Sequence, residues 1–178
     1  MRVEAHTEMS TEMHAKATAE AHAKASAKAS TEASTEVHTE THVEAHVEIY
    51  TDGSSTNKQG VNSDAGAAFY IPSLDLLRAK HIRGTNSIAE IIAIDYALWY
   101  CIEKLSIKNV IILSDSEYAI GVLSGQKKAR LYEELIGVVK SKIDKMDSVK
   151  FKHVDGHSGI KYNEMVDKAA KAAAKKSK

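Results

Sequence analysis

Four acidic side chains stand where a metal-binding or catalytic site could form. Asp52 and Asp115 each end a run of residues typical of a strand, and small polar residues follow at once. Glu90 lies early in one expected helix, and Asp167 lies early in the last. Carboxylates held at the ends of elements commonly serve metal sites or catalysis. One such acid alone is more often a solvated surface group, so the set of four carries the prediction.

These acids can converge if the two strands are neighbours. Adjacent parallel strands would bring Asp52 and Asp115 to the same end of a sheet, and a helix crossing that end would add Glu90. Several carboxylates repel one another unless cations neutralise them, and donor sets of oxygen alone favour Mg²⁺ or Mn²⁺. Two such ions could activate a water molecule and stabilise the leaving oxygen of a phosphodiester.

The hydrophobic pattern after residue 46 predicts one mixed-sheet α/β domain. Residues 53–66 are expected to form a hairpin loop, and Asn86 or Ser87 is expected to cap the first helix. A basic connection precedes the third helix. The expected strands are 47–52, 65–71, 76–83, 109–113 and 149–154, and the expected helices are 87–105, 117–123, 131–146 and 163–175.

A known family shares these motifs in the same order. The motifs are Ile49-Tyr50-Thr51-Asp52-Gly53-Ser54, Thr85-Asn86-Ser87-Ile88-Ala89-Glu90, Leu113-Ser114-Asp115-Ser116, and Gly156-His157-Ser158-Gly159 followed by Asn163-Glu164 and Asp167. Together they resemble type 1 ribonuclease H over residues 43–176. The resemblance implies a five-stranded mixed sheet flanked by helices. It also implies an endonuclease that hydrolyses the RNA strand of RNA–DNA hybrids and leaves 5′-phosphomonoesters.

The same resemblance implies a role for each acidic residue. Asp52, Glu90, Asp115 and Asp167 would bind two Mg²⁺ or Mn²⁺ ions. Glu90 would also approach the RNA 2′-hydroxyl, the group that distinguishes RNA from DNA. His157 would assist proton transfer or product release. Because all four acids are present, a hybrid-binding module without activity is disfavoured.

Substrate contacts are also implied, with two departures from the family. Gly53, Ser54, Thr85 and Asn86 would contact the nucleic acid. The segment after Asp52 lacks the Gly-Pro-Gly character common in the family. The basic protrusion of some members is reduced here to residues 127–130, which implies weaker binding of the hybrid.

Residues 3–50 form twelve tetrapeptides in which apolar or Thr positions alternate with Glu, Lys, His or Ser. A helix is favoured locally by Ala and by charges four residues apart, yet a four-residue repeat keeps no constant apolar face on a helix. An extended strand separates the two residue classes over its whole length. We expect a long β extension over residues 1–42 that pairs with other copies, with a helical or disordered segment as the alternatives.

Two functions follow for the whole chain. Residues 43–178 would be the catalytic domain, and residues 1–48 would mediate a homo-oligomer. The alternative is a fibre-forming strand protein that displays the enzyme domain as decoration. Residues 1–48 carry nine Glu and four Lys or Arg, a net charge of −5, whereas the remainder carries 20 basic and 15 acidic residues, a net charge of +5.

The sequence favours an intracellular protein that does not enter a membrane. No apolar run approaches the length of a membrane span, and residues 1–30 lack the core of a signal peptide. The single cysteine, Cys101, lies in an apolar stretch and is expected to be a buried core residue in a reducing compartment.

Overall fold

A computed structural model describes residues 45–56, 62–156 and 159–175. All of them belong to the compact unit Val43–Lys178. The predictions for the repeat before residue 45 and for His157 therefore lie outside the described residues.

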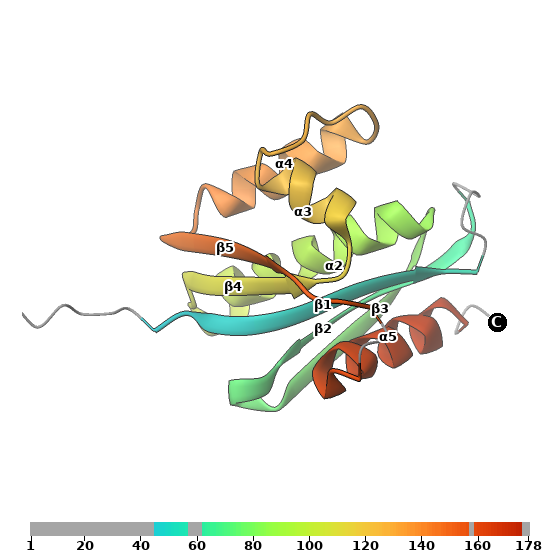
Figure 1. The fold of residues 1–178 in the computed structure, drawn as a ribbon, viewed down its shortest axis with the longest axis horizontal. Coiled ribbons are helices and arrows are strands. Elements are labelled where there is room, and N and C mark those ends of the chain that lie inside the picture. Colours follow the sequence, from blue (N-terminus) through green and yellow to red (C-terminus); the bar gives the residue numbers. More distant parts are fainter. Residues whose placement is uncertain (1–44, 57–61, 157–158, 176–178) are drawn as a thin grey trace, which may run out of the picture. The chain divides into compact units, whose positions relative to one another are not determined.

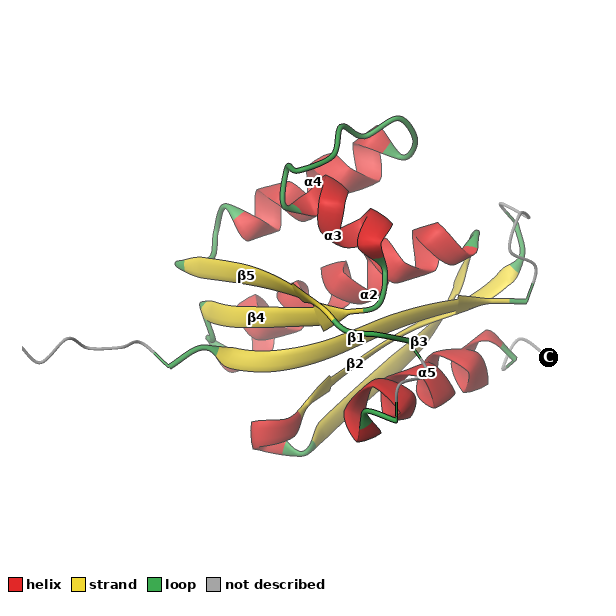
Figure 2. Cartoon of the chain, in the orientation of Figure 1, coloured by secondary structure: helices red, strands yellow, loops and turns green. Residues whose placement is uncertain are grey.

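Five strands form one mixed sheet, as the sequence predicted (Figure 2). Their order across the sheet is β3-β2-β1-β4-β5. β1 pairs with β2 and β2 with β3 in antiparallel fashion, whereas β4 runs parallel to both β1 and β5. The strands are β1 (Val47–Ser55), β2 (Asp64–Ile71), β3 (Leu76–Arg83), β4 (Asn109–Ser114) and β5 (Ser148–His153).

Helices cover both faces of this sheet. The helical elements are η1 (Pro72–Leu74), α2 (Asn86–Tyr100), η2 (Cys101–Leu105), α3 (Glu117–Leu123), α4 (Glu133–Ile143) and α5 (Lys161–Ala174). α2, α3 and α4 lie on one side of the sheet and α5 lies on the other (Figure 1). None of the helices in the described part of the chain is long and apolar enough to cross a membrane.

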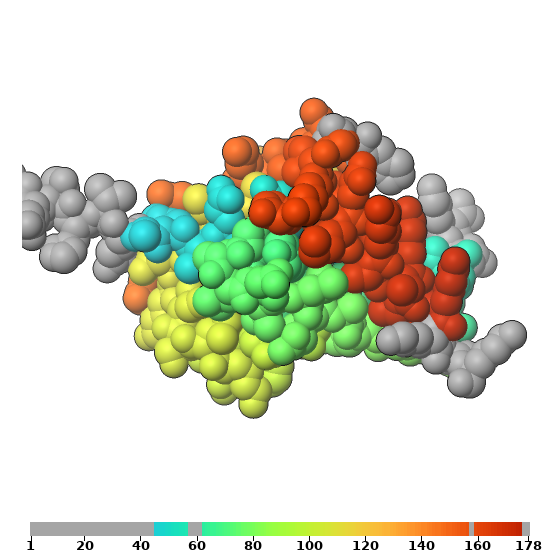
Figure 3. Space-filling view, turned by 90° about the horizontal axis from the view of Figure 1, so that it is seen from below, coloured from blue at the N-terminus to red at the C-terminus, as the bar shows by residue number. Residues whose placement is uncertain are grey.

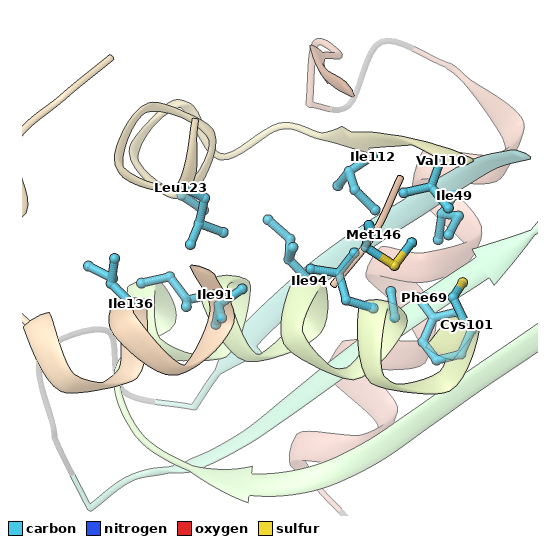
Figure 4. Packing of buried hydrophobic residues seen from close by; sticks show 14 of the residues in the cluster. Ile49, Phe69, Ile91, Ile94, Cys101, Val110, Ile112, Leu123, Ile136 and Met146 are labelled. Atoms are coloured by element: carbon cyan, nitrogen blue, oxygen red, sulfur yellow. The ribbon is translucent and has the colours of Figure 1, made fainter. Parts of the chain in front are cut away.

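The central strands supply side chains to a core on each face. Successive strand residues point to opposite sides, so Ile49 packs beneath α2 and Tyr50 packs beneath α5. Ile112 and Leu113 of β4 divide in the same way, which explains the continuous apolar run of that strand. Cys101 is fully buried in the first core (Figure 4), and burial raises the pKa of its thiol to about 11.

The predicted hairpin loop over residues 53–66 is too long. β1 continues to Ser55, and its last residues pair with β2, for example Gly53 with Ala67 and Ser54 with Gly66. Gly and Ser are poor strand formers, but pairing with a neighbouring strand outweighs local propensity. Asp52 therefore lies within a strand rather than at its end.

Three helix boundaries also differ from the prediction. Thr85 caps α2, because its hydroxyl accepts a hydrogen bond from the Ile88 amide at 3.3 Å. α5 begins at Lys161, two residues before the predicted start at residue 163. α4 spans Glu133–Ile143, shorter at both ends than the predicted 131–146. Helix α3 has the predicted bounds.

Candidate active site

Parallel pairing of β1 with β4 brings the two aspartates together. Tyr50 and Leu113 are register partners. Asp52 lies two residues further along β1, and Asp115 lies two residues after Leu113, immediately past the end of β4. Asp52 is only 7% exposed. The negative charges of Asp115, Asp167 and Glu90 all act on it, so the four predicted acids lie near one another at this end of the sheet.

The electrostatics of the site are dominated by Asp52. Burial raises the pKa of its carboxyl group to about 8, and the charges of Asp115 and Asp167 act in the same direction. The Gly53 amide donates a 2.8 Å hydrogen bond to Asp52 Oδ1, which opposes the shift. Burial and the neighbouring carboxylates therefore favour the protonated form of this carboxyl group, and positive charge nearby would favour its ionised form.

A backbone contact between β1 and α2 places Glu90 beside Asp52. A Cβ atom on Gly53 would lie 2.1 Å from the backbone nitrogen of Glu90 and 2.2 Å from the carbonyl carbon of Ala89. No side chain fits in that space, so strand and helix touch directly at a glycine. The position of Glu90 therefore depends on this glycine.

Two side chains orient the Glu90 carboxylate. Asn86 Nδ2 donates to Glu90 Oε1 at 2.7 Å, and the Ser116 hydroxyl donates to Glu90 Oε2. Burial raises the pKa of Glu90, while the hydrogen bond from Ser116 opposes that shift. Asn86 is itself held by β1, since its Oδ1 accepts from the Ser55 amide at 3.3 Å.

Asp167 reaches the site from α5 and is paired with a cation. Lys171, one helical turn later, donates to Asp167 Oδ2 at 2.8 Å. This hydrogen bond raises the pKa of Lys171, and the charges of Asp52 and Asp115 add to the effect. α5 packs closely on β2, because a Cβ atom on Gly66 would lie 2.1 Å from the Ala170 carbonyl oxygen.

The connection from β5 to α5 lies against Asp115. A Cβ atom on Gly156 would lie 2.8 Å from Asp115 Oδ2, and His153 Nε2 lies 3.2 Å from the Asp115 carbonyl oxygen. Gly156 immediately precedes His157 in the sequence. The proposed role of His157 stays a prediction, because that residue is outside the described part.

The predicted substrate contacts have structural partners of their own. Gly53 and Thr85 are buried, and Ser54 and Asn86 are half-buried. Thr85 Oγ1 lies 3.2 Å from the hydroxyl of Tyr132, the residue that precedes α4. Contact of these four residues with a nucleic acid remains a prediction.

Four residues that contact the predicted site residues were assigned no role of their own from the sequence. They are Ser116, Tyr132, His153 and Lys171. The four-residue spacing of Asp167 and Lys171 is a recognisable ion-pair signal on a helix. Ser116 follows Asp115 directly and is a suitable helix cap. Tyr132 and His153 approach the site only through tertiary packing, which their spacing in the sequence does not reveal.

The donor set fits a hard divalent cation. The converging groups are carboxylates, and their mutual repulsion is what a cation would relieve. Within the described residues, no three acidic, His or Cys side chains are gathered closely enough to form a ready metal cluster. Glu90 is hydrogen-bonded to Asn86 and Ser116, and Asp167 is bonded to Lys171. The assignment of metal ligands therefore stays a prediction.

The sheet order and the group of acids around the buried Asp52 define a ribonuclease H-like α/β domain. The family model described as RNase H matches residues 44–175. The chain therefore belongs to the RNase H family, which confirms the predicted resemblance.

Two solved structures are similar in fold. RNase H1 from the halophilic archaeon Halobacterium salinarum NRC-1 is 22% identical with a TM-score of 0.62, and the match covers 72% of this chain and 97% of that one. The N-terminal RNase H domain of Rv2228c from Mycobacterium tuberculosis, solved as a fusion with maltose-binding protein, is 20% identical with a TM-score of 0.60. That match covers 72% of this chain and 94% of the other.

Proposed function

We propose that this protein hydrolyses the RNA strand of RNA–DNA hybrids with two bound Mg²⁺ or Mn²⁺ ions. The observation that carries the proposal is that three acids, Glu90, Asp115 and Asp167, act on a buried Asp52 in an RNase H family domain. The ligands would be Asp52, Glu90, Asp115 and Asp167. When bound, the ions would supply Lewis-acid chemistry for attack by water and for departure of the leaving oxygen.

The protein's own residues would hold and orient these groups. Asn86 and Ser116 fix both oxygens of Glu90, so that this carboxylate is presented in one orientation. Lys171 holds Asp167 and offsets part of the negative charge of the site. Gly53 keeps β1 and α2 in direct contact, so the acids stay on rigid elements.

Cleavage of a labelled hybrid with the matching DNA duplex as a negative control tests this function. We expect RNA-strand cleavage that requires Mg²⁺ or Mn²⁺ and that Asp115→Asn reduces by at least a thousandfold, while circular dichroism stays unchanged. Asp147→Asn is the matched control, because Asp147 is an exposed acid in the turn before β5. Full activity of the Asp115→Asn protein would refute the assignment of the site.

A second proposal concerns the N-terminal repeat. We place the boundary of the catalytic domain after residue 42 and assign self-association to residues 1–48. The strict alternation of residue classes in the sequence supports this assignment. We place the enzyme inside the cell, where a buried free thiol such as that of Cys101 is usual.

A further inference from the structure

The last turns of α2 and the edge strand β3 carry a second group of side chains, away from the acids. We call it the aromatic–basic patch, and it comprises Arg78, Lys80, Tyr96, Trp99, Tyr100 and Lys104. Trp99 follows Glu90 by nine residues, which is about 13 Å along the helix axis and half a turn around it. Figure 3 shows the end of α2 and η2, in yellow-green, standing out beside the green β3.

Rings and cations interleave in this patch. Tyr96 and Trp99 are stacked, with ring centroids 6.2 Å apart and planes inclined by 21°. Lys80 Nζ lies 4.6 Å from the centroid of the Tyr96 ring, and Lys104 Nζ lies 5.6 Å from the centroid of a Trp99 ring. Trp99 remains 37% exposed, which is high for so large an apolar side chain.

The charge of the patch is predominantly positive. Asp95 lies among these residues, but its carboxylate is bonded to Lys142 of α4. Glu103 is the other nearby acid along the helix. These two acids face four cations, namely Arg78, Lys80, Lys104 and Lys142. An anion bound here would therefore meet a surplus of positive charge.

A hollow in the patch has the size and lining for a small planar group. Lys80, Asp95, Tyr96 and Trp99 surround a pocket of about 360 Å³. Stacking on an aromatic side chain is available to every base, because each base has a planar π face. Cations beside such rings are the usual partners of the phosphate backbone.

We propose that the aromatic–basic patch binds single-stranded nucleic acid, with a base against Trp99 and phosphates beside Lys80 and Lys104. This site is separate from the four acids and does not depend on cleavage. A single strand next to a hybrid would have a place to bind on the same domain.

Trp99 is the one tryptophan of the chain, so its fluorescence reports on this site alone. The full-length protein in EDTA is titrated with a short oligothymidylate, which contains no RNA. We expect saturable quenching of the Trp99 emission that weakens steeply with added salt. Lys104→Gln and Lys80→Gln should each weaken binding about three- to tenfold. Each should also reduce by about one the magnitude of the slope of log binding constant against log salt concentration.

Lys150→Gln is the matched control, because Lys150 is an exposed lysine on the opposite edge strand, β5. It should leave the quenching curve unchanged. Lys104 is fully on the surface, so its variant keeps the test valid even if Lys80→Gln lowers the stability of the fold.

Three outcomes would overturn the proposal. In the first, fluorescence anisotropy shows that the labelled oligothymidylate binds while the Trp99 emission does not change. In the second, the oligothymidylate does not bind at all. A peptide of residues 1–42, which is acidic, quenches Trp99 where the oligothymidylate does not, which would assign the patch to a protein segment. Loss of hybrid cleavage is measured separately and leaves this test intact.

Discussion

At the scale of single residues, the proton on Asp52 links the site to the stability of the fold. Its pKa is raised from 3.8 to about 8 by burial and by neighbouring carboxylates. Between these values the folded protein binds more protons than the unfolded chain, so this residue's contribution to stability is lost as pH rises through that window.

Asp52→Asn should therefore stabilise the protein in EDTA at high pH. We expect a gain on the order of 1–3 kcal/mol near pH 9, or several degrees in Tm, and a much smaller gain near pH 5. Thermal unfolding at both pH values measures it, with Asp147→Asn as the control. An equal gain at the two pH values would contradict the raised pKa of Asp52.

The hydroxyl of Ser116 serves two partners. It donates to Glu90 and accepts from the Ala119 amide at 3.2 Å as the cap of α3. Ser116→Ala should lower hybrid cleavage about 10- to 100-fold through the orientation of Glu90. Loss of the cap should also cost about 1 kcal/mol of stability.

Two further variants separate the roles of Ser116. Ser116→Thr keeps a hydroxyl and should recover most of the activity. Ser116→Asp keeps a capping oxygen but opposes Glu90 with a like charge, so its stability should recover while its activity does not. Matched kcat/KM values for the Ala and Thr variants would show that the hydroxyl does not orient Glu90.

At the scale of elements, the contact of β1 with α2 at Gly53 is the most restrictive feature. Gly53→Ala places a methyl group 2.1 Å from the Glu90 backbone nitrogen, so the helix must move away. We expect a loss of more than 2 kcal/mol, as overpacking of a core brings, and a fall in cleavage of at least 100-fold.

Gly137→Ala is the matched control for this element. Gly137 lies within α4, and a Cβ atom there would meet nothing within 4 Å. Alanine in a helix interior makes the folded state roughly 0.5–1 kcal/mol more stable than glycine does, so this variant should be slightly more stable and fully active. Denaturant unfolding and a cleavage assay on both proteins compare them. Wild-type activity in the Gly53→Ala protein would show that α2 can shift without displacing Glu90.

The sequence could predict elements better than the contacts between them. Alternation and apolar runs identified all five strands, and the bounds of α3 and β3 were predicted correctly. The four acids were found because their motifs can be read directly from the sequence, although Asp52 lies within β1 rather than at its end. The close approach at Gly53 could not be predicted from the sequence, because that residue meets Glu90 only when α2 crosses β1. The second partner of Ser116 was hidden for the same reason.

At the scale of the whole molecule, the two parts of the chain carry opposite charge. Residues 1–48 have a net charge of −5 and the remainder has +5. Exposed lysines and arginines also line the edge strands β3 and β5. Charged edges discourage strand-to-strand association of the domain itself. Self-association is therefore expected to reside in the repeat.

The last prediction concerns the pH dependence of this association. Six His residues share the polar positions of the repeat with nine Glu residues. Histidine gains positive charge as pH falls from 8 towards 6, so it would offset much of the repulsion between Glu residues in stacked chains. Association of the full-length protein should therefore strengthen over that range. Light scattering shows the association, and circular dichroism shows whether β structure accompanies it.

A chain that begins at residue 43 is the control for that experiment. It keeps all the acids of the site and every described strand and helix, so it should remain folded, active and monomeric at each pH. If the truncated chain were unfolded, that result would show that the repeat is part of the domain core. A full-length protein that stays monomeric from pH 8 to pH 6 would refute assembly through the repeat, because a strand of that length cannot satisfy its backbone hydrogen bonds without neighbours.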